Sequence, residues 1–312
     1  MRALITGGFG YLGGRIAQAL CDAGVNVVLG TRKEQKVPDW LPQATTVKLI
    51  WDDQEDLRSV CEQVDVVIHA AGMNAQDCAN DPAGAMEFNG GATARLIQAS
   101  AIANVKKFIY LSTTHVYCAP LIGEITEDTC PSNRHPYAVS HRAAEDLLLH
   151  HISKNNNMVG IVLRLSNGVG APVHIMTNCW GLAINDFCRQ VVVNGQIVVH
   201  SPPNVQRDFV PISVLCGTVS SILNSDNVES SIINVASSNA KNLHEIVGLI
   251  CERAELVLDI TPEVIFKSRT DTAGNNYNLS ISNNKLSKIV NINSNLEGEV
   301  DQLLMKCKEW FG

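Results

Sequence analysis

The sequence carries little charge and lacks the features that mark several classes of protein. Charged residues make up 18% of the 312 residues, the formal net charge is -7, and no dense basic run is present, so we expect no nucleic-acid partner. No apolar stretch approaches the roughly 20 residues that a membrane span needs, so we expect no membrane partner. The first apolar run begins almost at the N-terminus and leaves no room for a signal peptide, so we expect a cytoplasmic protein.

The ten cysteines include no Cys-x-x-Cys pair. Because zinc sites use such closely spaced pairs, we expect no metal site and interpret the cysteines as reduced thiols. The hydrophobic content of 46% is ordinary for a globular protein. A chain of this length fits one large domain or two closely packed ones.

Apolar runs alternate with helical patterns through the first half of the chain. The expected strands are 3–6, 25–29, 46–50, 64–70, 107–112 and 159–165, and the expected helices are 12–23, 53–63, 89–103 and 137–153. The strands are β-branched runs, as a sheet buried on both faces requires, so the pattern predicts a doubly wound parallel α/β sheet, a Rossmann fold. Beyond residue 170 the regularity weakens, with helical patterns near 177–193, 242–254 and 296–310. We expect a Rossmann domain over 1–170 with a return segment at about 207–236, and a smaller region built from 171–206 and 237–312.

A glycine-rich turn at residues 7–13 follows the first expected strand and opens the first helix. Gly7 permits the tight bend, Gly10 lets backbone amides approach a pyrophosphate, and Gly13 lets the helix pack closely on the strand. The helix N-terminus, at Tyr11 and Leu12, offers free N–H groups and a partial positive charge to phosphates. The turn therefore predicts a dinucleotide cofactor.

The end of the second expected strand bears on which dinucleotide is bound. An acidic residue there normally bonds the adenosine ribose and selects NAD, but this strand ends in Leu29-Gly30-Thr31-Arg32-Lys33. Gly30 leaves space, and Arg32 can stack on adenine and pair with a 2′-phosphate. Alternatively, Arg32 and Lys33 only face solvent in a loop. We predict that the cofactor is NADP rather than NAD.

A phenol and an imidazole lie one helical turn apart at Tyr137 and His141. Further segments follow the glycine-rich turn in order along the chain: Asp52-Asp53, 69–72, Asn89, 111–117, 124–128, 136–137, 163–167 and 207–210. This series resembles the extended short-chain dehydrogenase/reductase family, especially its nucleotide-sugar epimerases, dehydratases and reductases. The resemblance runs from residue 3 to about residue 290, and it makes 171–206 and 237–312 the expected substrate-binding region.

The resemblance implies a catalytic group of Thr113, Tyr137 and His141. Tyr137 would exchange a proton with a sugar oxygen that Thr113 also bonds. His141 stands where the family carries a lysine, which holds the nicotinamide ribose and lowers the tyrosine pKa by its charge. A histidine is mostly neutral at pH 7, so it can still bond the ribose but adds less positive potential.

The resemblance also implies binding roles around the cofactor and the sugar. Asp52, with Asp53 beside it, would accept the adenine amino group, and Asn89 would sit at a helix start, where it caps and holds backbone near the cofactor. Asn89 could instead be only an N-cap, and Arg207 only the partner of Asp208 in a local ion pair. The remaining expected contacts are Ala70, Ala71 and Gly72 along the nicotinamide, Asn167 and Arg207 on the sugar-nucleotide diphosphate, and His115 and Asn178 near the sugar.

We therefore expect an NADP- or NAD-linked enzyme that reduces or epimerises a nucleotide sugar. A 4,6-dehydration is not expected, because Thr114-His115 stand where dehydratases carry Asp-Glu. The alternative is a binding protein that retains the cofactor or the sugar nucleotide as a sensor or scaffold. That alternative is supported by His141 and by Val214, which stands where the family usually carries an acid.

We also expect a homodimer, because family members commonly pair the two helices that follow Asn89 and carry Tyr137. Each helix carries an apolar stripe that could form the interface, although both stripes could equally face the sheet. The stripes are Ala92, Leu96 and Ala99, and Ala144, Leu147 and Leu148.

Overall fold

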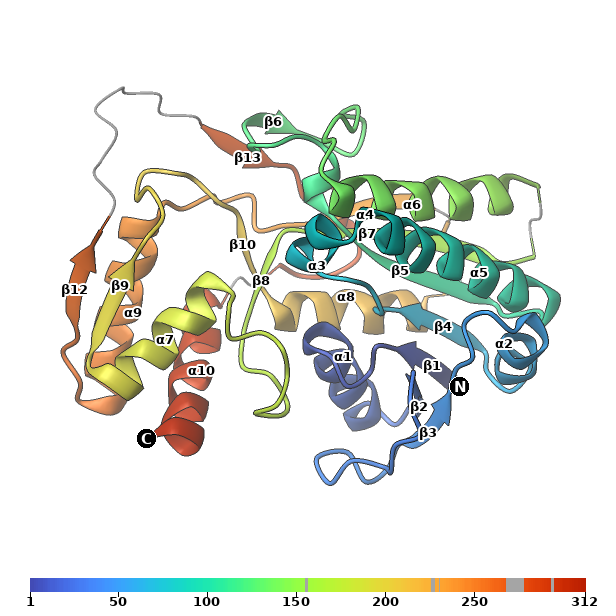
Figure 1. Ribbon diagram of the computed structural model, residues 1–312, viewed down its shortest axis with the longest axis horizontal. Helices are drawn as coiled ribbons and strands as arrows, with labels where there is room; N and C mark the ends of the chain where they lie inside the picture. Colours follow the sequence, from blue (N-terminus) through green and yellow to red (C-terminus); the bar gives the residue numbers. More distant parts are fainter. Residues whose placement is uncertain (155–156, 226–227, 230, 268–277, 293–294) are drawn as a thin grey trace.

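The computed structural model describes residues 1–154, 157–225, 228–229, 231–267, 278–292 and 295–312. Its centre is a seven-stranded sheet in the order β11-β7-β5-β4-β1-β2-β3, in which every neighbouring pair is parallel (Figure 1). The predicted doubly wound sheet is therefore confirmed. The strands are β1 Arg2–Thr6, β2 Asn26–Thr31, β3 Thr45–Lys48, β4 Val66–His69, β5 Lys107–Thr113, β7 Val159–Leu165 and β11 Ser231–Val235.

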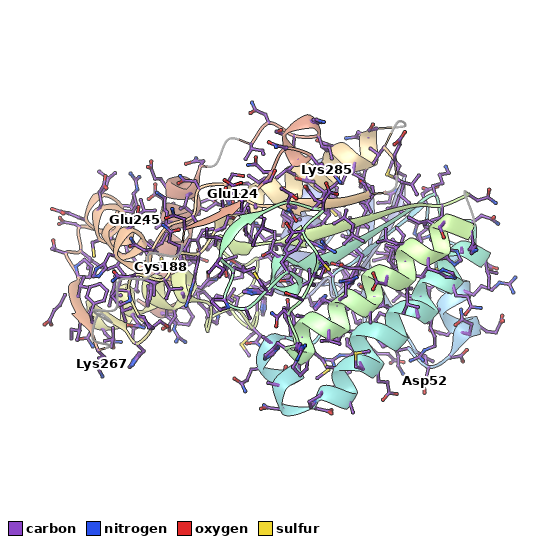
Figure 2. All side chains as sticks on the ribbon, turned by 90° about the horizontal axis from the view of Figure 1, so that it is seen from above. Asp52, Glu124, Cys188, Glu245, Lys267 and Lys285 are labelled. Atoms are coloured by element: carbon purple, nitrogen blue, oxygen red, sulfur yellow. The ribbon has the colours of Figure 1, made fainter. Side chains whose placement is uncertain are left out.

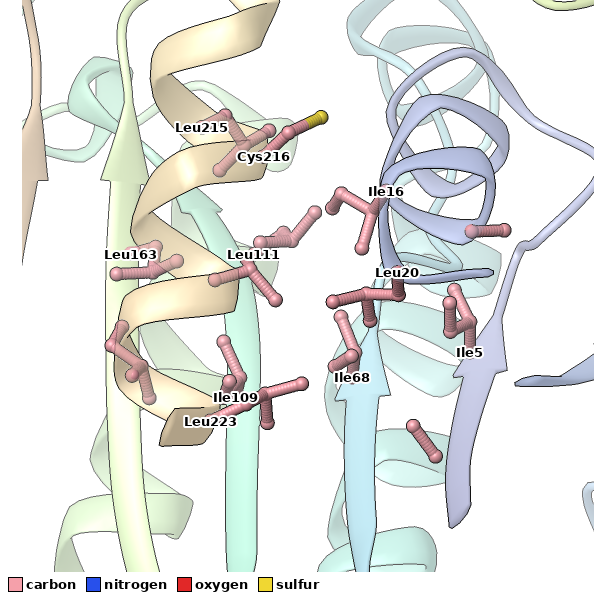
Figure 3. Packing of buried hydrophobic residues seen from close by; sticks show 14 of the residues in the cluster. Ile5, Ile16, Leu20, Ile68, Ile109, Leu111, Leu163, Leu215, Cys216 and Leu223 are labelled. Atoms are coloured by element: carbon pink, nitrogen blue, oxygen red, sulfur yellow. The ribbon is translucent and has the colours of Figure 1, made fainter. Parts of the chain in front are cut away.

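Helices cover both faces of this sheet. On one face, α1 (Tyr11–Asp22) packs beside α8 (Ile212–Asn224), and Ile16 and Leu20 of α1 share one apolar cluster with Leu223 of α8, Ile68 and Ile109 (Figure 3). Each such fully buried side chain contributes about 1.5–3 kcal/mol relative to an exposed one. The other face is covered by α2 (Gln54–Cys61), α5 (Thr93–Ile102) and α6 (Pro136–Lys154).

The two apolar stripes considered for a dimer interface are mostly turned inward. Their buried members are Ala92, Leu96, Ala99, Ala144 and Leu148, and the last four belong to the core on this face of the sheet. Leu147 alone among the six residues of the stripes is exposed, at 43%. Most residues of the stripes therefore pack against the sheet, and the homodimer stays a prediction.

Two expected helices start at other residues than the sequence pattern suggests. The helix expected at 89–103 is α5 preceded by a π-helical turn, Met86–Ala92, which itself follows α3 (Ala75–Asn80) and α4 (Pro82–Ala85). The helix expected at 177–193 is α7 (Ala183–Asn194), because 177–182 form a loop. α8 was not expected as a helix, although its segment was expected to return to the sheet.

A second group of elements packs around its own core beside the carboxyl edge of the sheet, on the left in Figure 1. It consists of α7, α9 (Leu243–Leu258), α10 (Leu296–Phe311) and the parallel pair β9 (Gln196–Val199) and β12 (Glu263–Phe266). Seen from above, Cys188 and Glu245 of this group lie at one end of the molecule and Asp52 at the other (Figure 2). The parts of the expected ranges at 226–227, 230, 268–277 and 293–294 lie outside the described residues.

Short elements join the two parts of the molecule. β8 (Asn167–Val169) pairs with β10 (Phe209–Pro211), β6 (Gly123–Ile125) pairs with β13 (Leu279–Ile281), and Thr114–Val116 and Leu286–Lys288 are single 3-10 turns. Helix α1, which begins after the glycine-rich turn, also bonds to the segment that follows β8. Tyr11 Oη donates to Gly170 O at 2.7 Å, and Arg15 Nη1 donates to Ala171 O at 2.7 Å and pairs with Glu299. No helix in the described part of the chain is long and apolar enough to cross a membrane.

Candidate active site

A cavity of about 980 Å³ opens where the strands of the sheet end and the second group of elements begins. It is large enough for a dinucleotide's reactive half together with a small ligand. Most of the residues singled out from the sequence line it: Gly7, Gly10, Tyr11, Leu12, Gly13, Thr31, Arg32, Ala70, Ala71, Gly72, Thr113, His115, Tyr137, His141, Asn167, Asn178 and Arg207. Asp52, Asp53 and Asn89 do not line it.

The glycine-rich turn has the geometry of a phosphate cradle. Gly7 has φ +66°, a left-handed conformation, and its carbonyl accepts from Gly10 N at 2.8 Å. A Cβ on Gly13 would overlap the Gly7 carbonyl oxygen, so only glycine lets α1 start this close to the turn. Neither a capping side chain nor an acidic residue occupies the first turn of α1. Its amides are therefore open to an anion, and these residues fit a bound dinucleotide.

Aromatic side chains frame the end of the cavity near Arg32. The guanidinium carbon of Arg32 lies 5.9 Å from the centroid of the Phe88 ring, and Trp51 meets Phe88 edge-on at 5.4 Å. Gly30 was expected to leave space for the cofactor, but the space beside it is filled by a core side chain. A Cβ at this position would lie 2.7 Å from Leu49 Cδ1, so the glycine lets Leu49 pack against the strand. An acidic side chain is excluded from this position unless Leu49 moves.

The two aspartates after the third strand lie away from the cavity. Asp52 is exposed, and Asp53 is the N-cap of α2, accepting from Glu55 N at 3.0 Å and Asp56 N at 3.1 Å. Asp52 therefore does not line the cavity, and its contact with the adenine stays a prediction. Trp51, one residue earlier, is the side chain of this segment that lines the cavity.

Asn89 holds the backbone near the cavity but does not cap a helix. It lies within the π-helical turn, buried, and its Oδ1 accepts from Met73 N at 2.8 Å. Its Nδ2 donates to Ser140 Oγ at 3.0 Å. Asn89 thus joins the loop after β4 to α6, the helix that carries Tyr137. The expected position at a helix start is wrong, because the π-helical turn begins three residues earlier.

Thr113, Tyr137 and His141 come together at the centre of the cavity wall. The rings of Tyr137 and His141 meet edge-on with centroids 4.5 Å apart. Burial raises the pKa of Tyr137 to about 12, and a hydrogen bond with Thr113 offsets part of that rise. Burial lowers the pKa of His141 to about 4. At neutral pH the site therefore holds a protonated phenol beside an uncharged imidazole.

The far side of the cavity carries His115, Asn167, Asn178 and Arg207. Desolvation, followed by the charge of Arg207, lowers the pKa of His115, so this imidazole is uncharged near pH 7. Asn167 Nδ2 donates to Asp208 O at 2.7 Å, which leaves its Oδ1 for a ligand. The described residues show no ion pair between Arg207 and Asp208, whose carboxylate instead accepts from Ser166 Oγ at 2.6 Å.

Comparison with known families identifies this architecture. The model of the NAD-dependent epimerase/dehydratase family matches residues 3–236, which is most of the chain. The chain belongs to this family. The match includes the glycine-rich turn, Thr113, Tyr137 and Arg207, and it ends with β11.

Individual members of the family are similar over part of the chain. UDP-glucose 4-epimerase from Drosophila melanogaster is 28% identical over 189 residues, 54% of this chain and 54% of the relative. GDP-6-deoxy-D-mannose reductase from Pseudomonas aeruginosa is 27% identical over 211 residues, 65% of this chain and 67% of the relative. The chain spans about half the length of several curated relatives that it matches.

A solved structure shows the same fold. UDP-glucuronic acid 4-epimerase from Bacillus cereus, in complex with UDP-glucuronic acid and NAD, superposes with a TM-score of 0.79 at 20% identity over 99% of both chains. The family and its named enzymes favour the enzyme hypothesis over the binding-protein alternative.

Sequence reasoning missed several side chains of the site, namely Trp51, Phe88, Tyr110 and Asn185. Trp51, Phe88 and Asn185 line the cavity directly, and Tyr110 lies behind it with its hydroxyl 2.7 Å from His141 Nδ1. Nothing in their spacing distinguishes them from core residues. Tyr110 could have been recognised from the sequence, because a tyrosine within a fully buried strand needs a hydrogen-bond partner for its hydroxyl.

Proposed function

We propose that this protein is a reductase that uses a reduced nicotinamide cofactor to convert a keto group of a nucleotide sugar to an alcohol. The observation that carries the proposal is the protonated phenol of Tyr137 beside the uncharged His141. A phenol that keeps its proton at neutral pH serves as a general acid, which is what ketone reduction requires. The bound cofactor would supply a hydride to the carbonyl carbon.

The residues of the cavity wall take complementary roles in this reaction. Tyr137 donates its proton to the carbonyl oxygen and regains one from solvent after the product alcohol leaves. Thr113 Oγ1 accepts from His115 N at 3.1 Å, so its hydroxyl proton is available to the same oxygen. His141 binds the nicotinamide ribose. His115 contacts the sugar as an uncharged imidazole that can also accept a proton.

The smaller region binds the sugar nucleotide in this proposal. Arg207 provides a charge-assisted donor to the diphosphate, with Asn167 beside it, and Asn178 approaches the sugar from the loop before α7. The boundaries proposed are 1–170 with the return segment 207–236 for the cofactor, and 171–206 with 237–312 for the substrate. The tie between α1 and this region through Arg15 and Glu299 supports a fixed distance between the two ligands.

NADP is the proposed cofactor, in a family named for NAD. Arg32 is exposed at the cavity rim near Phe88, where its guanidinium can pair with a 2′-phosphate, and Gly30 provides no carboxylate that would repel that phosphate. Arg32→Ala should narrow the preference for NADPH over NADH by about 1.5–3 kcal/mol, whereas the neighbouring control Lys33→Ala should change it less. Calorimetry in which the parent binds NADH as tightly as NADPH would refute this choice.

Epimerisation is the second candidate, because several relatives are named UDP-sugar 4-epimerases. It requires Tyr137 to remove a proton before it returns one. With a pKa of about 12, only about 1 phenol in 10⁵ is ionised at pH 7, which disfavours that first step. Chromatography of UDP-glucose after incubation with protein and oxidised cofactor tests this candidate directly.

The deciding experiment follows NADPH oxidation with a panel of 4-keto nucleotide sugars. The parent should turn over at least one of them, and Tyr137→Phe should abolish turnover while NADPH binding, measured by calorimetry, stays nearly unchanged. Turnover that survives Tyr137→Phe undiminished would remove the acid role. A parent that binds NADPH and turns over none of the panel would favour the binding-protein alternative.

A further inference from the structure

A ladder of three buried rings lies directly behind the cavity wall. The ring of Tyr110 on β5 stacks on His69 of β4, with centroids 5.6 Å apart, and on His141 of α6, with centroids 5.8 Å apart. Tyr110 Oη lies 2.7 Å from His141 Nδ1. Both side chains are buried, with 1% of Tyr110 and 6% of His141 exposed. The hydrogen bond between them is therefore shielded from water.

The direction of this hydrogen bond follows from the hydrogen-bonding capacity of the two groups. In the described part of the chain the Tyr110 hydroxyl has only the His141 nitrogen as a partner. If Nδ1 carried the proton and donated it, the buried hydroxyl would have no acceptor for its own proton, which costs about 1–3 kcal/mol. If the hydroxyl donates, both groups are satisfied. The proton of a neutral His141 must then sit on Nε2.

The free N–H of His141 points toward the cavity. Nε2 lies 3.8 Å from the place that a Cβ on Gly72 would occupy, at the segment after β4 that lines the cavity. The hydrogen bonds of the described residues give Nε2 no partner within the protein. We propose that Tyr110 is a positioning residue that holds His141 as the Nε2–H tautomer, so that this N–H is presented to a ribose hydroxyl of the nicotinamide cofactor. The cofactor half of this inference rests on the proposed function.

The other ring of the ladder does not compete for the same proton. His69 Nδ1 lies 2.6 Å from Thr6 Oγ1, and its Nε2 lies 2.8 Å from Thr93 Oγ1. Thr6 Oγ1 also accepts from Ala71 N at 3.2 Å, and its hydroxyl can donate to His69 Nδ1. Both ring nitrogens of His69 therefore have hydrogen-bond partners other than Tyr110.

A protonated His141 would lose this arrangement. Its Nδ1–H would face the Tyr110 oxygen and leave the phenol proton without an acceptor. The titratable groups around it are His69 on β4, Tyr110 on β5, Cys78 on α3, and Tyr137 and Glu145 on α6, of which Glu145 is paired with Arg164 of β7. Burial also lowers the pKa of His141, in agreement with a neutral ring.

The first test is nitrogen NMR of the ligand-free protein, labelled at histidine. The signals of His141 are identified by their loss in His141→Asn. Between pH 6 and 8, Nδ1 should show the shift of an unprotonated ring nitrogen and Nε2 that of a protonated one. The Nε2 signal should move when NADPH is added. Protonation of Nδ1 in the parent would overturn the inference whatever the protein catalyses.

The second test removes the phenol oxygen in Tyr110→Phe and uses Tyr117→Phe as the matched control. Tyr117 is equally buried, at 1% exposed, and its Oη donates to Asn234 Oδ1 at 2.7 Å. Tyr110→Phe should weaken NADPH binding roughly three- to tenfold, in line with one hydrogen bond, and Tyr117→Phe should leave it unchanged. Equal affinity in both variants would overturn the positioning role. Thermal unfolding of both shows whether each has folded.

A double-mutant cycle separates positioning from a merely structural role. A lysine at 141 presents N–H donors without any help from a tautomer. Tyr110→Phe should therefore lose its effect on NADPH binding in a His141→Lys background, whereas a structural defect would carry over unchanged, and that result would overturn the inference. If the parent shows the expected tautomer but binds no nicotinamide cofactor, the cofactor half of the inference and the proposed function both fail, and only the tautomer assignment stands.

Discussion

Replacing His141 by lysine should lower the pKa of Tyr137 and with it the pH at which the rates in both reaction directions change their pH dependence. The ring centroids of Tyr137 and His141 are 4.5 Å apart, so a lysine ammonium would place a unit charge close to the phenol. At about 5 Å and an effective dielectric constant of about 20, the attraction between that charge and a phenolate is about 3 kcal/mol. This corresponds to a Tyr137 pKa lower by about 2 units.

The pKa shift should move the pH at which both rates change their pH dependence. Alcohol oxidation needs the phenolate, whose fraction at pH 7 would rise from about 1 in 10⁵ to about 1 in 10³, but the phenolate of a stronger acid is also a weaker base. Because the equilibrium constant at a given pH fixes the ratio of kcat/KM in the two directions, the substitution should change both by the same factor. Above about pH 10, reduction should fall and oxidation should level off in the variant, whereas neither change should occur below about pH 12 in the parent.

Nicotinamide absorbance measures both directions from pH 6 to 11. In the parent, the reduction rate should be flat across this range, and the oxidation rate should rise tenfold per pH unit because the pKa of Tyr137 lies at about 12. His141→Gln is the uncharged control. The same pH dependence in the lysine and glutamine variants would show that charge at this position does not act on Tyr137. A parent reduction rate that falls between pH 7 and 8 would show that Tyr137 does not retain its proton.

Three further outcomes follow from other parts of the structure. Glu145→Gln should lower the free energy of unfolding by about 3–5 kcal/mol, because it leaves the Arg164 guanidinium buried without its charged partner. The control Glu62→Gln removes an exposed ion pair and should lower it by at most about 1 kcal/mol. Urea unfolding measures both, and equal effects would refute the stabilising role of the buried ion pair. Gly13→Ala should abolish NADPH binding, because the added Cβ would overlap the Gly7 carbonyl oxygen in the glycine-rich turn. The control Gly248→Ala changes a helical glycine with open space around it, so it should bind NADPH normally and raise the free energy of unfolding by about 0.5–1 kcal/mol. NADPH binding by Gly13→Ala would contradict the cradle geometry. The protein should sediment as a homodimer at micromolar concentration, and a monomer alone would end that prediction.

The sheet could be predicted because its signal is local. The strands of a doubly wound sheet are short β-branched runs buried on both faces, and several of them here are followed by a helix, so residues 3–165 carry the pattern without reference to distant contacts. The predicted strand ends differ from the observed ones by at most two residues. β2 was expected to end at residue 29 but continues through Thr31, so Gly30 lies within the strand and not in the loop after it.

The parts that escaped prediction depend on tertiary contacts. The π-helical turn before α5 has no sequence signature, and its Asn89 finds partners in Met73 and Ser140, which lie in other elements. α8 is apolar almost all round because it packs against the sheet, against α1 and against the segment around Leu286 and Val290, so it lacks the amphipathic pattern of a surface helix. Val214, interpreted as a lost functional acid, is one of its buried core residues.

The neutral state of His141 is built into the packing of α6. Glu145 lies one helical turn beyond His141 on the same helix and could hold a charged imidazole. Its carboxylate is instead taken up by Arg164, with Nη2 at 2.6 Å and Nε at 3.0 Å, and by the Ser112 hydroxyl. With that charge neutralised and Tyr110 donating to Nδ1, the cost of a proton on His141 rises and none of its neighbours offsets it. The ion pair between α6 and β7 therefore also keeps positive charge away from Tyr137, so the stability of the fold and the pKa of Tyr137 depend on one buried contact.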